Sequence, residues 1–132
     1  MTNKELVKGF FIEAYENLNH AFAMQHFADD YIDHSPAGAR SNTDAVGILK
    51  IVEHTFSDIK LQIHDLIEED NLVATRITFS ATQVGEYQGV PPTGKRIAWE
   101  ALENFRIQDG KIAESWGYWP DMMIRELLLS DQ

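Results

Sequence analysis

Residues 95–118 read KRIAWEALENFRIQDGKIAESWGY, and this stretch decides the fold. Apolar and polar side chains alternate on both sides of Asp109-Gly110, which is the pattern of two half-buried β-strands. An Asp-Gly pair between alternating runs is a strong signal for a tight hairpin turn. We therefore predict an antiparallel hairpin whose second strand ends at Pro120.

Period-two alternation assigns a face to each residue of this hairpin. One face of the first strand carries Ile97, Trp99, Ala101, Glu103, Phe105 and Ile107. One face of the second strand carries Ile112, Glu114, Trp116 and Tyr118, and its other face carries Ala113, Ser115, Gly117 and Trp119.

The rest of the chain divides into helices before the hairpin and strands leading into it. Apolar residues from Leu6 to Leu18 repeat with helical spacing, and Asn19 is a suitable N-cap for a second helix over residues 20–27. Residues 28–36 are polar and predicted to be irregular. A third helix is expected from Ser41, where Ser-Asn-Thr-Asp resembles a capping box. Alternating runs then predict strands near residues 59–63 and 73–81, and residues 122–129 a final helix.

This order of elements predicts an α+β fold in a single domain over residues 1–132. A chain of 132 residues is long enough to bury roughly two-thirds of its unfolded surface. A hydrophobic content of 44% excludes intrinsic disorder. The chain has no cysteine, which excludes disulfides and thiolate metal sites and fits a cytoplasmic location.

The charge of the chain argues against two classes of partner. The net charge is −10, spread evenly along the sequence, whereas nucleic-acid binding needs clustered Lys and Arg. No apolar run is long enough for a membrane span or a signal peptide, because Glu5, Glu13 and Glu16 interrupt the apolar N-terminal segment. We expect neither nucleic acid nor membrane as a partner.

Asp121 is the clearest candidate for chemistry. It follows the aromatic, uncharged run from Trp116 to Pro120. Aromatic surroundings remove water from a carboxylate, which raises its pKa and suits it to acid/base catalysis near neutral pH. Asp directly before an apolar helical segment is also a typical N-cap. The sequence leaves both roles open.

His34 and the aromatic side chains are further candidates. His34 stands beside Asp33, and a histidine next to a carboxylate can hold a proton near pH 7, although an exposed loop position explains it equally well. Trp99, Trp116, Tyr118 and Trp119 could form the walls of a small-molecule site or belong to a core or interface.

Glu103 and Glu114 are unusual because each lies on an otherwise apolar strand face. A carboxylate in such a place is costly unless it is paired or functional. Arg76 and Arg106 lie on neighbouring predicted strands, and we expect them to pair with these carboxylates.

Other catalytic signatures are missing from the sequence. No nucleophile elbow, dinucleotide-binding or phosphate-binding motif occurs. His20, His26 and the acidic residues near His34 lack the spacing of a helical zinc site. We predict no metal and no cofactor.

Three segments together resemble the SnoaL-like polyketide cyclase family of the NTF2-like superfamily. They are the loop GVPPTGKR at residues 89–96, the hairpin FRIQDGKIAESW at residues 105–116 followed by Asp121, and the segment YIDHSP at residues 31–36. The resemblance covers nearly the whole chain. It implies a cone in which N-terminal helices pack on a curved antiparallel sheet around a central pocket, and a homodimer formed through the sheets.

The resemblance also implies a function: cofactor-free intramolecular aldol chemistry on a small apolar carbonyl compound such as a polyketide ester. Asp121 matches the acid/base of the family, and His34, Trp116 and Tyr118 are candidate donors to an enolate oxygen. We expect Trp99, Trp116, Tyr118 and Tyr31 to contact the substrate. The family's antibiotic cyclases use a histidine deep in the pocket, whereas the last histidine here is His64. A non-catalytic ligand-binding module, and an isomerase or epoxide hydrolase of the same fold, therefore stay open as alternatives.

Overall fold

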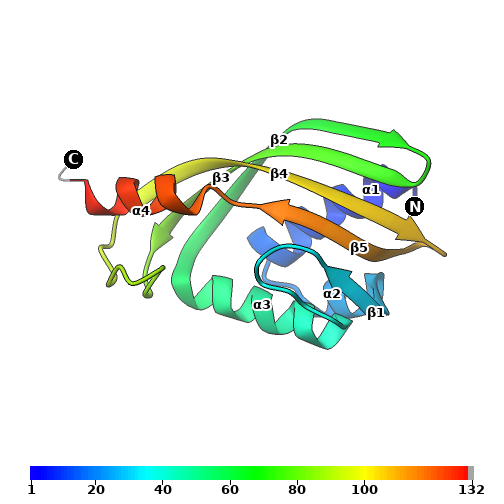
Figure 1. The fold of residues 1–132 in the computed structure, drawn as a ribbon, viewed down its shortest axis with the longest axis horizontal. Coiled ribbons are helices and arrows are strands. Elements are labelled where there is room, and N and C mark those ends of the chain that lie inside the picture. Colours follow the sequence, from blue (N-terminus) through cyan, green and yellow to red (C-terminus); the bar gives the residue numbers. More distant parts are fainter. Residues whose placement is uncertain (131–132) are drawn as a thin grey trace.

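The computed structural model describes residues 1–130 as helices packed on one curved sheet (Figure 1). The five strands lie in the order β1-β5-β4-β3-β2. The strands are β1 Phe27–Asp33, β2 Phe56–Glu69, β3 Leu72–Gln83, β4 Arg96–Gln108 and β5 Lys111–Tyr118. The helices are α1 Asn3–Phe10, the π-helix η1 Phe11–Glu16, α2 His20–His26, α3 Asn42–Thr55 and α4 Asp121–Leu129. The predicted α+β class is confirmed.

Local capping fixes where the helices begin. The Thr2 side chain and Glu5 form a capping box at the start of α1. Asn19 caps α2, as predicted. Ser41 caps α3 by accepting a hydrogen bond from the Asp44 N–H at 3.0 Å. The capping box predicted at Ser41 is not complete. It would need the Asp44 carboxylate to accept from the backbone N–H of Ser41, but this carboxylate accepts from the backbone N–H of Arg40 instead.

The predicted β4–β5 hairpin is confirmed. Asp109 and Gly110 have φ of 52° and 75°, the pair of positive φ angles that a type I′ turn requires. The pairing shifts by one residue between Arg106 and Ile107: Arg106 faces Glu114, whereas Ile107 faces Ile112. Such a bulge reverses the faces of all later residues relative to simple alternation.

The predicted grouping of Ile112 with Glu114, Trp116 and Tyr118 is therefore wrong, whereas those three do share a face, opposite Ser115 and Gly117. Ile112 shares the inward face with Ser115, and both are buried. Glu114, Trp116 and Tyr118 lie on the outer face.

Strand β1 corrects the prediction of an irregular segment over residues 28–36. It pairs in parallel with β5, with Asp33 opposite Ser115, so the sheet is mixed rather than wholly antiparallel. Exposed Asp29 and Asp30 in the middle of β1 hide the apolar alternation that marks a strand.

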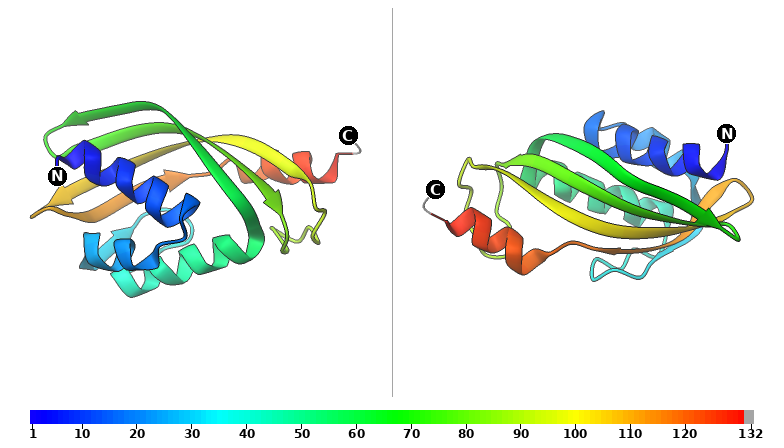
Figure 2. Two further views of the ribbon diagram at one scale, coloured as in Figure 1. Left: turned by 180° about the vertical axis from the view of Figure 1, so that it is seen from behind. Right: turned by 90° about the horizontal axis from the view of Figure 1, so that it is seen from above.

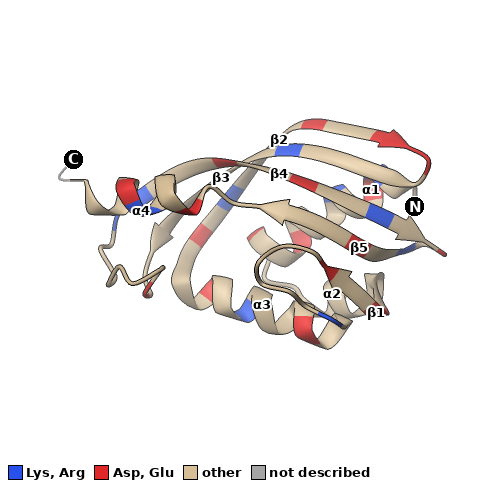
Figure 3. Cartoon of the chain, viewed as in Figure 1, with Lys and Arg blue, Asp and Glu red and all other residues tan. Residues whose placement is uncertain are grey.

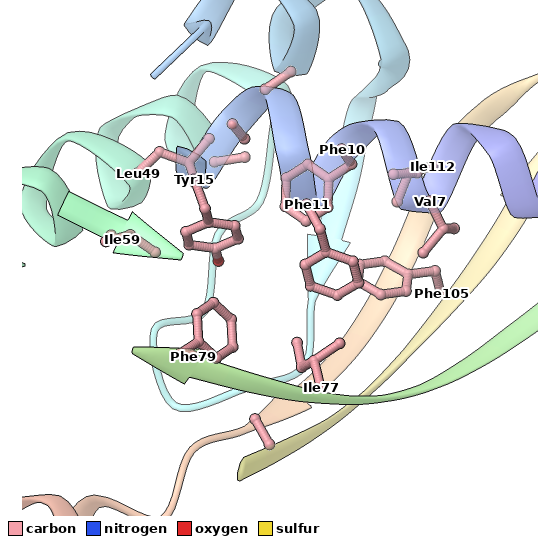
Figure 4. Packing of buried hydrophobic residues seen from close by; sticks show 14 of the residues in the cluster. Val7, Phe10, Phe11, Tyr15, Leu49, Ile59, Ile77, Phe79, Phe105 and Ile112 are labelled. Carbon is pink, nitrogen blue, oxygen red and sulfur yellow. The ribbon is translucent and has the colours of Figure 1, made fainter. Parts of the chain in front are cut away.

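Helices α1 to α3 lie on the concave side of the sheet, and α4 extends beyond one end of it (Figure 2). Aromatic side chains from helices and strands pack between these layers (Figure 4). The ring centres of Phe11 and Phe105 are 5.5 Å apart, and those of Tyr15 and Phe79 are 5.2 Å apart in edge-to-face contact. This packing forms part of the hydrophobic core between the helices and the sheet.

Charged residues are spread over helices and strands, and neither sign gathers in one place (Figure 3). In the part of the chain that the structure describes, no helix is both long and apolar enough to cross a membrane.

Candidate active site

A cavity of about 390 Å³ lies between the concave face of the sheet and the helices. This volume is within the range of roughly 300–1,000 Å³ that is typical of small-molecule sites. Most of its wall is apolar, with side chains from α1, α3, β1 and β4. Its polar wall is formed by Tyr15, Tyr31, Asp33, Ser35, Tyr87, Gln88, Glu103, Ser115 and Asp121.

Asp121 lines the cavity at the first turn of α4. The N-cap of this helix is Pro120, which makes no side-chain capping bond, so the N-cap interpretation of Asp121 is wrong. Its carboxylate instead accepts a short hydrogen bond from the Tyr87 hydroxyl. Burial, followed by this bond to Asp121, raises the pKa of the Tyr87 phenol far above its usual value. Tyr87 is thus a neutral donor that holds one oxygen of Asp121.

Tyr87 belongs to the loop over residues 84–95, which one buried side chain anchors. The amide nitrogen of Gln83 donates to the carbonyl oxygens of Gly85 and Val90, at 2.9 and 3.0 Å. Its amide oxygen accepts from the N–H and hydroxyl of Thr93, at 2.9 and 2.7 Å. Gln83 therefore satisfies the loop's backbone groups from inside and fixes where Tyr87 lies.

Glu103 projects into the same cavity from the inward face of β4. Its side chain is buried, and this burial raises the pKa of the carboxyl from 4.5 to about 7. The neighbouring Trp119 side chain favours the charged form and opposes part of the rise in pKa, and the negative charge of Asp33 adds to the rise.

The expected arginine pairing is wrong for Glu103 and correct for Glu114. Arg106 reaches Glu114 at 3.5 Å on the outer face. Arg76 pairs with Asp65 and Glu100, also away from the cavity. Within residues 1–130, Glu103 is therefore a buried acid without an arginine partner.

Tyr31, which we expected from the sequence to contact the substrate, lines the cavity. Its hydroxyl forms a 2.5 Å hydrogen bond with the Ser115 hydroxyl, which joins β1 to β5. Burial raises the pKa of the Tyr31 phenol well above its usual value, and it does the same for Tyr15. Both phenols are neutral hydroxyl groups at any physiological pH.

The structure does not bring His34, Trp116 or Tyr118 to the cavity. His34 stacks on Trp116 with ring centres 4.8 Å apart, and its Nε2 contacts Glu114 at 2.8 Å. Tyr118 is 58% exposed. The bulge in the β4–β5 pairing places Trp116 and Tyr118 on the outer face of the sheet, and His34, which follows β1, stacks on Trp116 there.

Trp99 is buried behind the cavity wall instead of lining it. Its ring stacks on Phe79 and packs against Trp119, with centres 5.6 and 5.1 Å apart. Trp119, which directly follows β5, is the tryptophan that lines the cavity among residues 1–130.

Comparison with known proteins places the chain in a family. The model of the SnoaL-like polyketide cyclase family matches residues 5–126. No curated protein matches the sequence.

Solved structures of similar proteins share the whole fold. TsrD from Streptomyces laurentii is 25% identical, with a TM-score of 0.86 over 96% of this chain and 93% of that one. AclR from Streptomyces galilaeus, a proposed hydroxylase, is 29% identical, with a TM-score of 0.80 over 97% of each chain.

An NTF2-like protein from Burkholderia pseudomallei shows the fold alone, at 14% identity and a TM-score of 0.79 over 98% of this chain and 100% of that one. The architecture is the NTF2-like cone. With the family model covering nearly its whole length, the chain belongs to the SnoaL-like polyketide cyclase family.

Proposed function

We propose that this protein is a cofactor-free acid/base enzyme that closes a ring in a small apolar carbonyl compound, by intramolecular aldol chemistry on a polyketide-like ester or ketone. The observation that carries the proposal is the Asp121 carboxylate in a largely apolar cavity, bonded to the neutral Tyr87 hydroxyl. Membership of the SnoaL-like family supports the reaction class.

In this mechanism Asp121 removes a proton from the carbon next to a carbonyl group. Tyr87 occupies one carboxylate oxygen and so orients the other toward the substrate. The enolate then attacks a second carbonyl of the same molecule. Because His34, Trp116 and Tyr118 lie outside the cavity, we leave them out of the proposed site, and Tyr31 remains as a contact to the substrate.

The test is ring closure of aryl-substituted 1,5-diketones and β-polyketo methyl esters, followed by mass spectrometry. The wild type should form cyclic products and Asp121→Asn should not, while both bind the compounds. Asp109→Asn is the matched control, since it makes the same chemical change in an exposed turn where Asn also tolerates positive φ. Binding without turnover by the wild type would instead assign a ligand-binding module.

Epoxide opening is a second candidate, because the cavity holds two carboxyl groups besides Asp121. Asp33 and Glu103 both line it, and such chemistry needs a water held between acidic groups. Styrene oxide in ¹⁸O-labelled water tests this: labelled diol formation that depends on Asp121 would favour hydrolysis over ring closure.

We further propose that two copies associate through the outer face of the sheet. Leu102 and Tyr118 are paired across β4 and β5, and they are 60% and 58% exposed. Apolar side chains at such a place fit a self-complementary interface. Sedimentation should show a dimer for the wild type and a monomer for Leu102→Lys; a dimeric variant would contradict this interface.

A further inference from the structure

Glu103 differs from the other two acids of the cavity in its hydrogen bonding. Both carboxylate oxygens of Asp33 accept from Ser35, each at 2.8 Å, and Asp121 accepts from Tyr87. In contrast, Glu103 Oε2 is almost fully buried and has no hydrogen-bond partner within residues 1–130. A buried carboxyl oxygen without a partner is costly, so its presence calls for a reason.

The neighbouring strand leaves room for this side chain. Gly117 on β5 lies directly opposite Glu103. A Cβ atom at Gly117 would lie 2.9 Å from Glu103 Oε1 and 3.1 Å from its Cδ. Any other residue there would therefore push the carboxyl group out of its place.

The composition of the cavity favours the neutral form of Glu103. Of the described residues that line it, none is Lys, Arg or His. The titratable groups that share the cavity are Tyr15, Tyr31, Asp33, Tyr87 and Asp121, which are either neutral phenols or acids. Nothing positively charged is therefore available to pair with a carboxylate or to stabilise an oxyanion, and a protonated carboxyl group is the strongest donor that such a cavity can offer.

We propose that protonated Glu103 is the general acid of this cavity and donates its proton to the oxygen of the substrate carbonyl group that is attacked, while Asp121 acts as the base. The proposal rests on the proposed function and adds to it the group that meets the developing negative charge. It also restricts the substrate class to uncharged ketones and esters, because the cavity has no cation to balance a carboxylate.

Asp121 takes a proton from the carbon next to one carbonyl group, and the electrons of that C–H bond form the new C–C bond to the second carbonyl carbon. The π electrons of the second carbonyl move to its oxygen, which takes the proton of Glu103. Glu103 is then a carboxylate and Asp121 a carboxylic acid, and exchange of one proton with water at each group restores both.

The first test needs no natural substrate and uses 1-tetralone labelled with ¹³C at its carbonyl, a ketone that can only accept hydrogen bonds. Infrared spectra of the bound ketone should show its carbonyl stretch shifted to lower wavenumber at pH 5.5, with most of the shift lost at pH 8.5. In Glu103→Gln the spectrum should not change with pH. Asp121→Asn and the control Glu100→Gln, on the outer face of the same strand, should behave like the wild type.

A pH-dependent shift that survives in Glu103→Gln, or a wild-type spectrum that is the same at both pH values, would overturn the proposal. So would failure of the ketone to bind at either pH. None of these results depends on Asp121 or on turnover.

The second test uses the ring-closure assay. Glu103→Gln should lower turnover at least about 100-fold, as loss of a general acid does, and remove any decrease in rate above pH 7. Glu100→Gln should retain wild-type turnover. Full turnover of Glu103→Gln together with loss of turnover in Asp121→Asn would refute the role of Glu103 and leave the proposed function standing; turnover retained in Asp121→Asn would refute the proposed function itself.

Discussion

Replacing Glu103 by Gln should remove a loss of stability that the wild type shows as pH rises from about 4.5 to about 7. Gln has nearly the shape of the neutral carboxyl group, but it cannot ionise. Burial raises the pKa of Glu103 from 4.5 to about 7, so the folded protein binds this proton more tightly than the unfolded chain does between those two values. The stability of the wild type therefore falls as pH rises through this window, and Glu103→Gln removes that loss.

The size of the effect follows from the same values. A rise of the pKa from 4.5 to about 7 corresponds to about 3 kcal/mol of stability, at about 1.4 kcal/mol for each pKa unit. The free-energy difference between Glu103→Gln and wild type should grow with pH from about 4.5 to 7 and stay constant above. A different hydrogen-bonding pattern of the Gln amide adds an offset that does not vary with pH.

Urea unfolding at pH values from 5 to 8.5, followed by tryptophan fluorescence, measures this difference. Other acidic groups titrate in both proteins and cancel in the comparison. Glu100→Gln, an exposed residue of the same strand, should give a difference from wild type that is nearly independent of pH. A difference for Glu103→Gln that is flat across this range, or one that favours the wild type more as pH rises, would refute the assignment of a buried, proton-binding Glu103.

Two of the three further predictions concern residues that line the cavity, and the third concerns a residue on the outer face of the sheet. Gly117→Ala should cost about 1–3 kcal/mol because its Cβ displaces the Glu103 carboxyl group, and a urea double-mutant cycle should show most of that cost disappearing in a Glu103→Ala background; additive costs would contradict this contact. Tyr87→Phe removes the donor to Asp121 and should lower ring-closure turnover roughly 10- to 100-fold while 1-tetralone still binds; unchanged turnover would show that the bond has no catalytic part. His34→Ala should leave turnover within about twofold and unfolding free energy within about 1 kcal/mol, because its contact with Glu114 is on the outer face; a large loss of turnover would return His34 to the site.

The sequence predicted well those elements whose structure depends on neighbouring residues. The Asp109-Gly110 turn and the caps Asn19 and Ser41 follow from local backbone chemistry, and the structure has all of them. Strand β1 was missed because it is defined by parallel pairing with β5, a contact between segments some 80 residues apart. Exposed Asp29 in its middle leaves no period-two signal.

The same holds for the candidate site: features that depend on distant contacts could not be predicted from the sequence. The resemblance pointed to Asp121, and the structure places that residue at the cavity. Its partner Tyr87 has no signal of its own, since its place depends on the buried amide of Gln83. A single-residue bulge, which alternation cannot reveal, moved Trp116 to the outer face and so changed which aromatic side chains line the cavity.

The way Gln83 holds its loop has a consequence for engineering. The Gln83 side chain bonds to Gly85, Val90 and Thr93, on both sides of residues 86–89, and three of its four bonds go to backbone atoms. Residues 86–89 can therefore be exchanged as a cassette while the frame that carries them is preserved. A library randomised at these positions, with Tyr87 retained, would explore new substrate shapes without changing Asp121, the proposed base, or Glu103, the proposed acid.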